Sequence, residues 1–461
     1  MSHILEAKDF HVIARDGLGR IANSTAHAMA FFRGALYVGT SVGNVSGADD
    51  TPGIFRYDPQ ADKWSSVYES PLIERTVRAD VPDINVIKHF TADAQSMLSR
   101  RRTENGPVPR DTGFRSMCIF QGSTDPGPAL YVTTMSRTGG LILRSIDGEK
   151  FEQVGEDGLV NKDIYSFRGL TALKGRLFAS PAGTVTDQHL DRNLAPDGCV
   201  YVSDDPAKGN WVRASESGFG DPDNEAVYCL YTAHDRVYAG TANPERGFQL
   251  WQTFAEGDPP FTWEPVILDG GGAFNHNMAV ATMVEFNGDL YVGSGITGLG
   301  YDTVHDVGPA SAELIRLRPD GSWDLIAGQP RFTPAGLKVP LSLLGPGLGD
   351  FYNSVIWVLG VHDGVIYLGT HQWEAIRCLQ VDPNKIVGGY QLWGSTDGEK
   401  WVPVLEDGNG NPAQLGIRTL TSTPFGFCVG THNHSRLIQL LGRRRKPDIN
   451  FEYGLQVLVG H

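Results

Sequence analysis

The stretch Leu36-Tyr-Val-Gly-Thr40 decides the fold, because close variants of it recur along the chain. The further copies are Leu130-Tyr-Val-Thr-Thr134, Leu177-Phe-Ala-Ser180, Val237-Tyr-Ala-Gly-Thr241, Leu290-Tyr-Val-Gly-Ser294, Ile366-Tyr-Leu-Gly-Thr370 and Phe427-Cys-Val-Gly-Thr431. Each copy follows an apolar strand and a turn, and most precede two more short strands. Four-stranded units that recur roughly every 50 residues are typical of propeller blades. The pattern predicts an all-β fold, a seven-bladed β-propeller of four-stranded blades.

The blades account for the whole chain as one domain over residues 1–461. We expect them near residues 27–69, 115–155, 167–215, 226–267, 278–327, 354–405 and 417–441, with an insertion at 70–112 and a C-terminal tail at 446–461. The segment Phe10-His-Val-Ile-Ala-Arg-Asp-Gly-Leu-Gly19 resembles the end of a blade, yet no blade precedes it. We therefore predict that residues 10–15 complete the last blade by pairing with 436–441, which removes an exposed sheet edge. Residues 451–459 are the alternative strand for that position.

Composition excludes several classes of protein. The 461 residues carry 53 acidic and 39 basic side chains, a net charge of −14, which argues against a nucleic-acid surface. No apolar run is long enough to cross a membrane, and the N-terminus has no secretory signal. The five cysteines are odd in number and form no Cys-x-x-Cys pair, so we expect reduced thiols in a cytoplasmic protein. A secreted protein trimmed of its signal would have the same sequence features.

Two predicted hairpins share a recognisable turn. Ser145-Ile-Asp-Gly-Glu-Lys-Phe151 and Ser395-Thr-Asp-Gly-Glu-Lys-Trp401 resemble the Asp-box of sialidase-like (BNR-repeat) propellers, although both are one residue shorter. The resemblance implies a turn in which Asp caps its own backbone, and it transfers no activity. Sialidases also have six blades and an Arg-Ile-Pro segment near the start, which we do not find here. Sialidase activity is therefore not expected.

Long insertions are predicted to gather at one face of the propeller. They follow second strands at 41–52, 181–197, 295–310 and 371–387, and precede first strands at 70–112 and 328–352. Loops in both positions reach the same mouth of the central channel, where binding or catalysis is usually found. Within 70–112, residues Thr91 to Arg102 are predicted to form a short helix, either a lid over the mouth or a surface embellishment.

Two sets of polar residues recur in the first strands. The strand entrances carry Asn23, Asp111, Ile164, Asn224, Asn277, Asn353 and Gln414, with His276 close to the fifth. We interpret these mainly as turn caps, with ligand binding by Asn224, Asn277, Asn353 and His276 as the alternative.

Four residues further on, the sequence supplies His27, Arg115, Arg168, Tyr228, Ala281, Trp357 and Arg418. Buried guanidinium groups are costly unless they are paired, and few acidic residues lie nearby in sequence. Their convergence favours an anionic ligand held by bidentate hydrogen bonds. The alternative is that each arginine pairs with protein groups and closes the channel.

Three histidines follow the second strands: His371, His432 and His434. His432 and His434 lie on the same side of an extended strand, which would suit a metal. General acid or base catalysis, or no role, are the other interpretations. The segment from Tyr301 to Asp306 could add a carboxylate to the mouth. No motif for a nucleotide or flavin occurs, so we expect no cofactor or a divalent metal.

These residues predict an enzyme acting on an anionic small molecule or acidic sugar. Arg115, Arg168 and Arg418 would bind the anion, and Trp357 would stack on the substrate. Tyr228 and His27 would move protons, which suits a lyase or isomerase. A hydrolase or cyclase could use the same groups. The alternative from another class is a non-catalytic platform for a protein or glycan, with residues 334–344 as the apolar stretch that could dock a partner.

Overall fold

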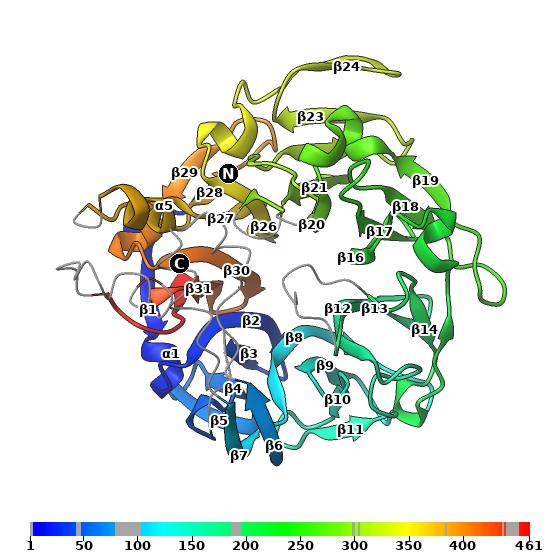
Figure 1. Cartoon of the computed structure of the whole chain (residues 1–461), viewed down its shortest axis with the longest axis vertical. Helices are drawn as coiled ribbons and strands as arrows, with labels where there is room; N and C mark the ends of the chain where they lie inside the picture. Colours follow the sequence, from blue (N-terminus) through cyan, green and yellow to red (C-terminus); the bar gives the residue numbers. More distant parts are fainter. Residues whose placement is uncertain are drawn as a thin grey trace.

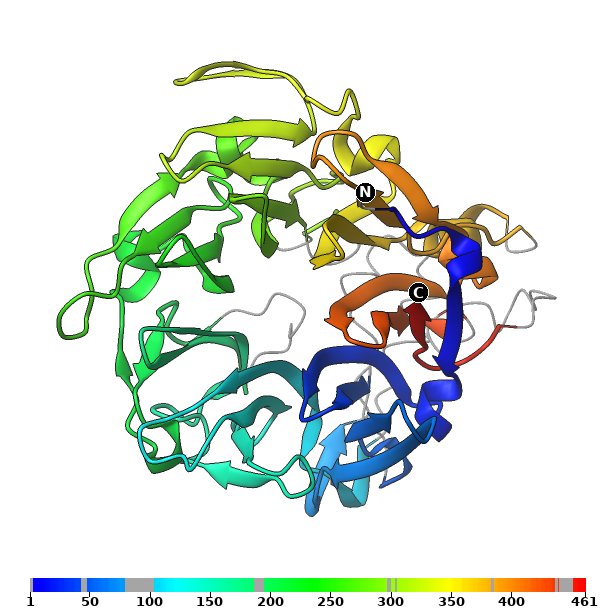
Figure 2. The same ribbon diagram turned by 180° about the vertical axis from the view of Figure 1, so that it is seen from behind.

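The computed structural model describes residues 3–42, 48–78, 103–185, 195–296, 300–302, 305–382, 385–435, 438 and 451–461. Antiparallel strands form nearly all of its regular structure and stand around a central axis (Figures 1 and 2). The prediction of an all-β fold is confirmed. Among the described helices, none is long and apolar enough to cross a membrane.

Each group of strands runs outward from an inner strand beside the axis (Figure 1). In chain order the groups are β2 (Asn23–Phe32), β3 (Ala35–Val42), β4 (Gly53–Asp58) and β5 (Lys63–Glu69); β8 (Asp111–Phe120), β9 (Ala129–Ser136), β10 (Ile142–Ser145) and β11 (Glu152–Val154); β12 (Ile164–Leu173), β13 (Arg176–Thr184), β14 (Tyr201–Ser203) and β15 (Val212–Arg213); β16 (Ala226–Ala233), β17 (Arg236–Ala242), β18 (Leu250–Thr253) and β19 (Glu264–Ile267); β20 (Ala279–Phe286), β21 (Asp289–Gly295), β22 (Leu314–Leu317) and β23 (Trp323–Ala327); and β26 (Asn353–His362), β27 (Val365–Gln372), β28 (Leu392–Ser395) and β29 (Val402–Leu405). Within a group, each strand pairs with the next.

The last group combines the two ends of the described chain. It consists of β30 (Gln414–Thr423), β31 (Gly426–Asn433), β32 (Val457–Gly460) and β1 (Phe10–Ala14), and β32 pairs with both β31 and β1. The predicted pairing of residues 10–15 with 436–441 is wrong. Ile438 instead lies in a helical turn, where its N–H donates to the carbonyl of His434, and it packs against α5 (Glu374–Val381). Residues 457–460 form a buried strand between β31 and β1, in agreement with the alternative given for residues 451–459 and not with a C-terminal tail.

The glycine of the recurring pentapeptide is required by close packing between neighbouring groups. A Cβ on Gly39 would lie 2.7 Å from Cβ of Phe114 on the next inner strand, and one on Gly240 would lie 2.4 Å from Cβ of Val280. Where the pentapeptide has Thr133, the hydroxyl donates to the carbonyl of Phe167 on the next inner strand. Buried apolar side chains fill the spaces between the first and second, the fourth and fifth, and the fifth and sixth groups.

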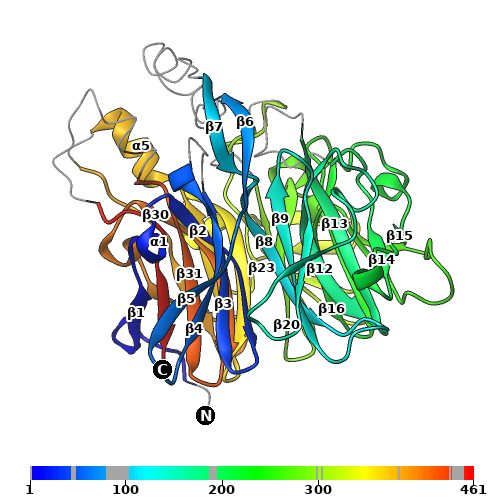
Figure 3. The same cartoon turned by 90° about the horizontal axis from the view of Figure 1, so that it is seen from below.

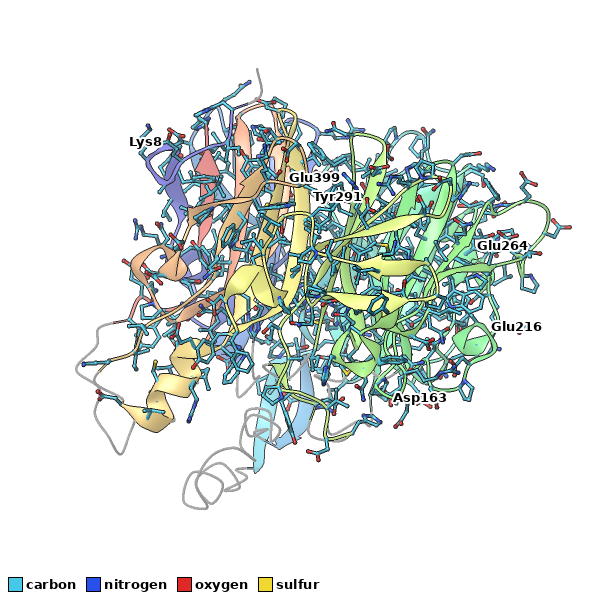
Figure 4. All side chains as sticks on the ribbon, turned by 90° about the horizontal axis from the view of Figure 1, so that it is seen from above. Lys8, Asp163, Glu216, Glu264, Tyr291 and Glu399 are labelled. Carbon is cyan, nitrogen blue, oxygen red and sulfur yellow. The ribbon has the colours of Figure 1, made fainter. Side chains whose placement is uncertain are left out.

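The Asp-box-like hairpins are turn devices, as their resemblance implied. Asp397 accepts hydrogen bonds from the backbone N–H of Glu399 and Lys400, and these bonds hold its pKa below the usual range. Gly398 allows the turn to lie against the hydroxyl of Tyr291 in the preceding group, and Tyr291 and Glu399 are neighbours in Figure 4. This hairpin therefore packs against the preceding group of strands.

The hairpin of β6 (Leu72–Arg78) and β7 (Thr103–Pro109) and helix α5 project from one face, away from both ends of the chain (Figure 3). The predicted helix from Thr91 to Arg102 lies outside the described residues. The insertion at 328–352 was predicted to lie over the mouth of the channel, but its position is different. Its hairpin, β24 (Arg331–Thr333) and β25 (Gly336–Lys338), lies at the outer edge beyond β23 (Figure 1), where Leu341 N–H donates to the carbonyl of Leu325.

Candidate functional site

A β-bulge lies at every position of the second predicted ring. The inner strands change register at His27, Arg115, Arg168, Tyr228, Ala281, Trp357 and Arg418. A bulge adds a residue that has no opposite partner in the ladder and re-aims its side chain. The same local device therefore presents each of these side chains at the same level of its group.

The asparagines at the entrances of the first strands form hydrogen bonds within the fold. Asn277 is 1% exposed; its amide donates to the carbonyl of Gly270 and to Glu313, and its oxygen accepts from the hydroxyl of Ser294. Asn224 and Asn353 likewise donate to the carbonyls of glycines in left-handed turns six residues earlier. These bonds match the turn-cap interpretation.

The arginines of the second ring interact electrostatically. Burial and the charges of Arg168 and Arg115 lower the pKa of Arg418 well below its usual range. Burial and Arg168 lower the pKa of Arg115 to about 9. Among the described residues, no carboxylate forms an ion pair with Arg168 or Arg418, and Nε of Arg418 is buried without a hydrogen-bond partner. Concentrated positive charge without balancing acids creates a strong preference for an anion.

Arg168 and Tyr228 form a close pair within this ring. The guanidinium carbon of Arg168 lies 3.8 Å from the centre of the Tyr228 ring, and its Nε donates to the Tyr228 carbonyl at 2.8 Å. Arg115 donates to the hydroxyl of Ser166 at 2.7 Å. Arg168 is thus held through its Nε by Tyr228, and Arg115 is held by the hydroxyl of Ser166.

His27 lies among these cations. Burial, then Arg418, Arg115 and Arg168, lower the pKa of His27 well below its usual range, so its imidazole is neutral near pH 7. Within the described part of the chain, its buried Nδ1 has no hydrogen-bond partner. His27 therefore cannot supply a proton at neutral pH, and a proton-accepting role requires that the surrounding charge first be neutralised.

His371, His432 and His434, which lie in or directly after the second strands, are clustered beside Trp357. Ring centres are 4.2 Å apart for His432 and His434, and 5.9 Å apart for His371 and His432. Trp357 lies edge-on to His371 at 4.6 Å and to His432 at 5.1 Å, and Arg418 lies 5.3 Å from the Trp357 ring centre. This cluster joins the arginine ring through Trp357 and Arg418.

All three imidazoles of the cluster are neutral near pH 7. Burial lowers the pKa of His371 to about 3 and that of His434 to about 4. Burial and the two neighbouring imidazoles lower the pKa of His432 well below its usual range. Neutral imidazoles are the form that binds metals.

For the other predicted contributors, no contact with the arginine ring or the histidine cluster is seen among the described residues. His276 is exposed at the end of a short 3-10 turn, Phe274–His276. The hydroxyl of Tyr301 donates to Asp306, and His305 pairs with Asp302 and Glu225. Asp302 and Asp306 thus have partners within their own loop, and His305 also reaches Glu225, which directly precedes β16.

Sequence reasoning missed two supporting residues. Thr25, two residues before His27 on the same strand, is joined to Nδ1 of His432 by a 2.6 Å hydrogen bond. Ser166 holds Arg115. Their equal offset of two residues before His27 and Arg168 is the signal that could have found them, because i and i−2 share a face of a strand.

All five cysteines are free thiols, and burial raises the pKa of Cys118 and of Cys428 to about 12. These thiols are therefore protonated near pH 7 and poorly reactive.

No family model matches this chain. No curated protein matches it either. Similar solved structures include a GH74 xyloglucanase from Xanthomonas campestris, with a TM-score of 0.48 and 15% identity over 92% of this chain and 53% of that one. A GH74 enzyme from Niastella koreensis has a TM-score of 0.43 and 14% identity over 86% of this chain and 46% of that one. The chain spans about half the length of these structures, and similarity at this level carries no inference about chemistry.

Proposed function

We propose that this protein is an enzyme that binds an anionic small molecule or acidic sugar at the ring of bulge residues. The observation that carries the proposal is the electrostatic coupling of Arg115, Arg168 and Arg418 without an ion-paired carboxylate on Arg168 or Arg418. A substrate carboxylate would accept bidentate hydrogen bonds from this cluster. Trp357 would stack on the substrate, since its ring lies beside Arg418.

In the proposed reaction His27 is a base that substrate binding activates. The bound carboxylate neutralises the arginine charges, so the pKa of His27 rises toward its usual range. His27 then accepts the proton from the carbon next to the carboxylate, and the electron pair moves into the carboxylate, where the arginines stabilise the added charge. Return of the proton to another carbon gives an isomerase, and loss of a leaving group protonated by Tyr228 gives a lyase. A hydrolase or cyclase would use the same pair.

The scaffold we propose for this site is a closed seven-bladed propeller. The pairing of β1 with β32 supports closure of the last blade, and the bridge between Thr25 and His432 supports contact between the last blade and the first. Closure would fix the spacing of His27 and Arg418, which come from opposite ends of the sequence. The cytoplasmic location remains a prediction.

The proposal is tested by thermal unfolding with glucuronate and with neutral glucose at constant ionic strength and with EDTA present. We expect glucuronate to raise the Tm of the wild type and glucose to leave it unchanged. Arg418→Gln should abolish the shift, whereas the control Arg33→Gln, at an exposed turn, should retain it. Equal effects of the two sugars, together with no shift from citrate, sulfate or phosphate, would overturn the proposal.

An interaction platform is the second candidate, because the β24–β25 region exposes an apolar patch. Phe332 is 84% exposed, Leu337 57% and Leu343 90%. Exposed groups of large apolar side chains mark protein contacts. A platform predicts that Phe332→Ser with Leu343→Ser abolishes co-elution with a partner and leaves the anion-dependent Tm shift unchanged.

A further inference from the structure

We propose that His371, His432 and His434 form a three-histidine site for a divalent transition metal such as Zn²⁺ or Co²⁺. One nitrogen from each ring lies within 4.8 Å of the other two. Tetrahedral zinc with bonds of about 2.0–2.1 Å to nitrogen needs its nitrogens about 3.3 Å apart. Small side-chain rotations therefore bring the three ligands onto one ion.

The environment of the cluster fits a metal better than a structural histidine core. These rings contact one another, Trp357 and the hydroxyl of Thr25. Among the described residues, no carboxylate forms an ion pair with any of the three, whereas His305 and His362 do form such pairs. Among described residues, the cluster therefore has no acidic group to stabilise protonated imidazoles. His371 comes from β27, His432 from β31, and His434 directly follows the end of β31. Three nitrogen ligands of this kind are a donor set that zinc and cobalt prefer.

Thr25 orients one ligand in the way metal sites require. Its hydroxyl is hydrogen-bonded to Nδ1 of His432 at 2.6 Å, which leaves Nε2 of that ring for the ion. A second partner on the other ring nitrogen fixes both the tautomer and the orientation of a metal-bound histidine. Thr25 is thus a positioning residue, and it comes from the first group of strands, whereas the ligands come from the last two.

Three protein ligands leave a fourth position for water or a substrate oxygen. Trp357 contacts His371 and His432, and its ring centre also lies 5.3 Å from the guanidinium carbon of Arg418, so the histidine cluster adjoins the arginine ring. An anion held there would neutralise charge from both the metal and the arginines. The metal site does not depend on the proposed function, because metal binding is measured without substrate.

The test is titration of Co²⁺ into metal-free, tag-free full-length protein at pH 7.5. We expect one ion per chain, with the visible absorption bands of four-coordinate Co²⁺, and displacement by Zn²⁺. His371→Gln and His434→Gln should each weaken Co²⁺ binding by about 100-fold or more, and Thr25→Val by about 10–100-fold. His11→Gln, an exposed histidine on β1, is the matched control and should bind as the wild type does.

Absence of stoichiometric Co²⁺ from folded wild type, or equal binding by folded His434→Gln, overturns the proposal. Circular dichroism and Tm establish folding of each variant. If His434→Gln does not fold, unweakened binding by Thr25→Val would overturn it instead. Since the glucuronate experiment contains EDTA and this one contains no anionic sugar, failure of one proposal is distinguishable from failure of the other.

Discussion

Arg168 covers the ring of Tyr228 at 3.8 Å and donates to the carbonyl of the same residue at 2.8 Å. The two residues occupy equivalent bulges in neighbouring groups of strands, β12 and β16. One cation of the cluster is therefore partly satisfied by protein groups, whereas Arg418 depends on the face of Trp357 and keeps a buried Nε without a partner among the described residues. Arg418 is the member of the ring that gains most from an incoming anion.

Replacement of Arg418 should separate stability from binding. Arg418→Met keeps the length of the side chain and removes a buried charge that Arg168 and Arg115 repel. We expect the free energy of unfolding to rise by about 1 kcal/mol or more, with loss of stabilisation by glucuronate. Urea denaturation with and without glucuronate measures both. A substantial destabilisation of Arg418→Met would show that protein groups already balance this charge.

The lowered pKa of His27 predicts acid sensitivity. The unfolded chain binds a proton to this imidazole near its usual pKa of about 6.5, and the folded chain does so only at much lower pH. Its contribution to stability is therefore complete above pH 6.5 and is lost as the pH falls below that value. In EDTA, between about pH 6 and pH 5, the wild type should lose about 1.4 kcal/mol per pH unit more than His27→Gln. Parallel pH profiles for the two proteins would contradict this.

The entrance asparagines should matter for stability. Asn277→Ala removes the partner of the Gly270 carbonyl, Glu313 and Ser294, all of them in a buried setting. We expect a loss of about 2–3 kcal/mol in the free energy of unfolding. Asn210→Ala, at an exposed position, should change it by less than about 0.5 kcal/mol. Wild-type stability of Asn277→Ala together with loss of glucuronate binding would favour the ligand-binding interpretation instead.

The strand β32 should be essential to the fold. Leu458 is fully buried between β31 and β1, so Leu458→Ala should cost about 2–5 kcal/mol in the free energy of unfolding. Leu343→Ala, at a 90% exposed side chain, should cost less than about 0.5 kcal/mol. Thermal or urea unfolding of both variants provides the comparison, and a mild effect of Leu458→Ala would contradict the role of this strand.

The repeated architecture could be predicted from the sequence because a glycine recurs where neighbouring strands pack so closely that a Cβ has no room. The predicted partner of residues 10–15 was wrong, because β1 pairs with β32. Ile438, the described residue of the run 436–441, lies in a helical turn, and a short apolar run is compatible with either a strand or a helix. Counting from each turn identified His27, Arg115 and Arg418 as equivalent because the turns fix the register. The offset of two residues from His27 could have identified Thr25 as a candidate, but its contact with His432 depends on pairing between strands far apart in the sequence, as do the single-residue bulges.

The bulges make the ring positions tolerant of amino-acid substitution. Because the bulged residue has no opposite partner in the ladder, its identity can change without altering the pairing of its neighbours. Ala281 occupies one such position and Arg418 another, each at the same register change of its inner strand. Substitution at the ring positions can therefore change which ligand is bound. The sheets that carry the ring can keep their sequence while this happens.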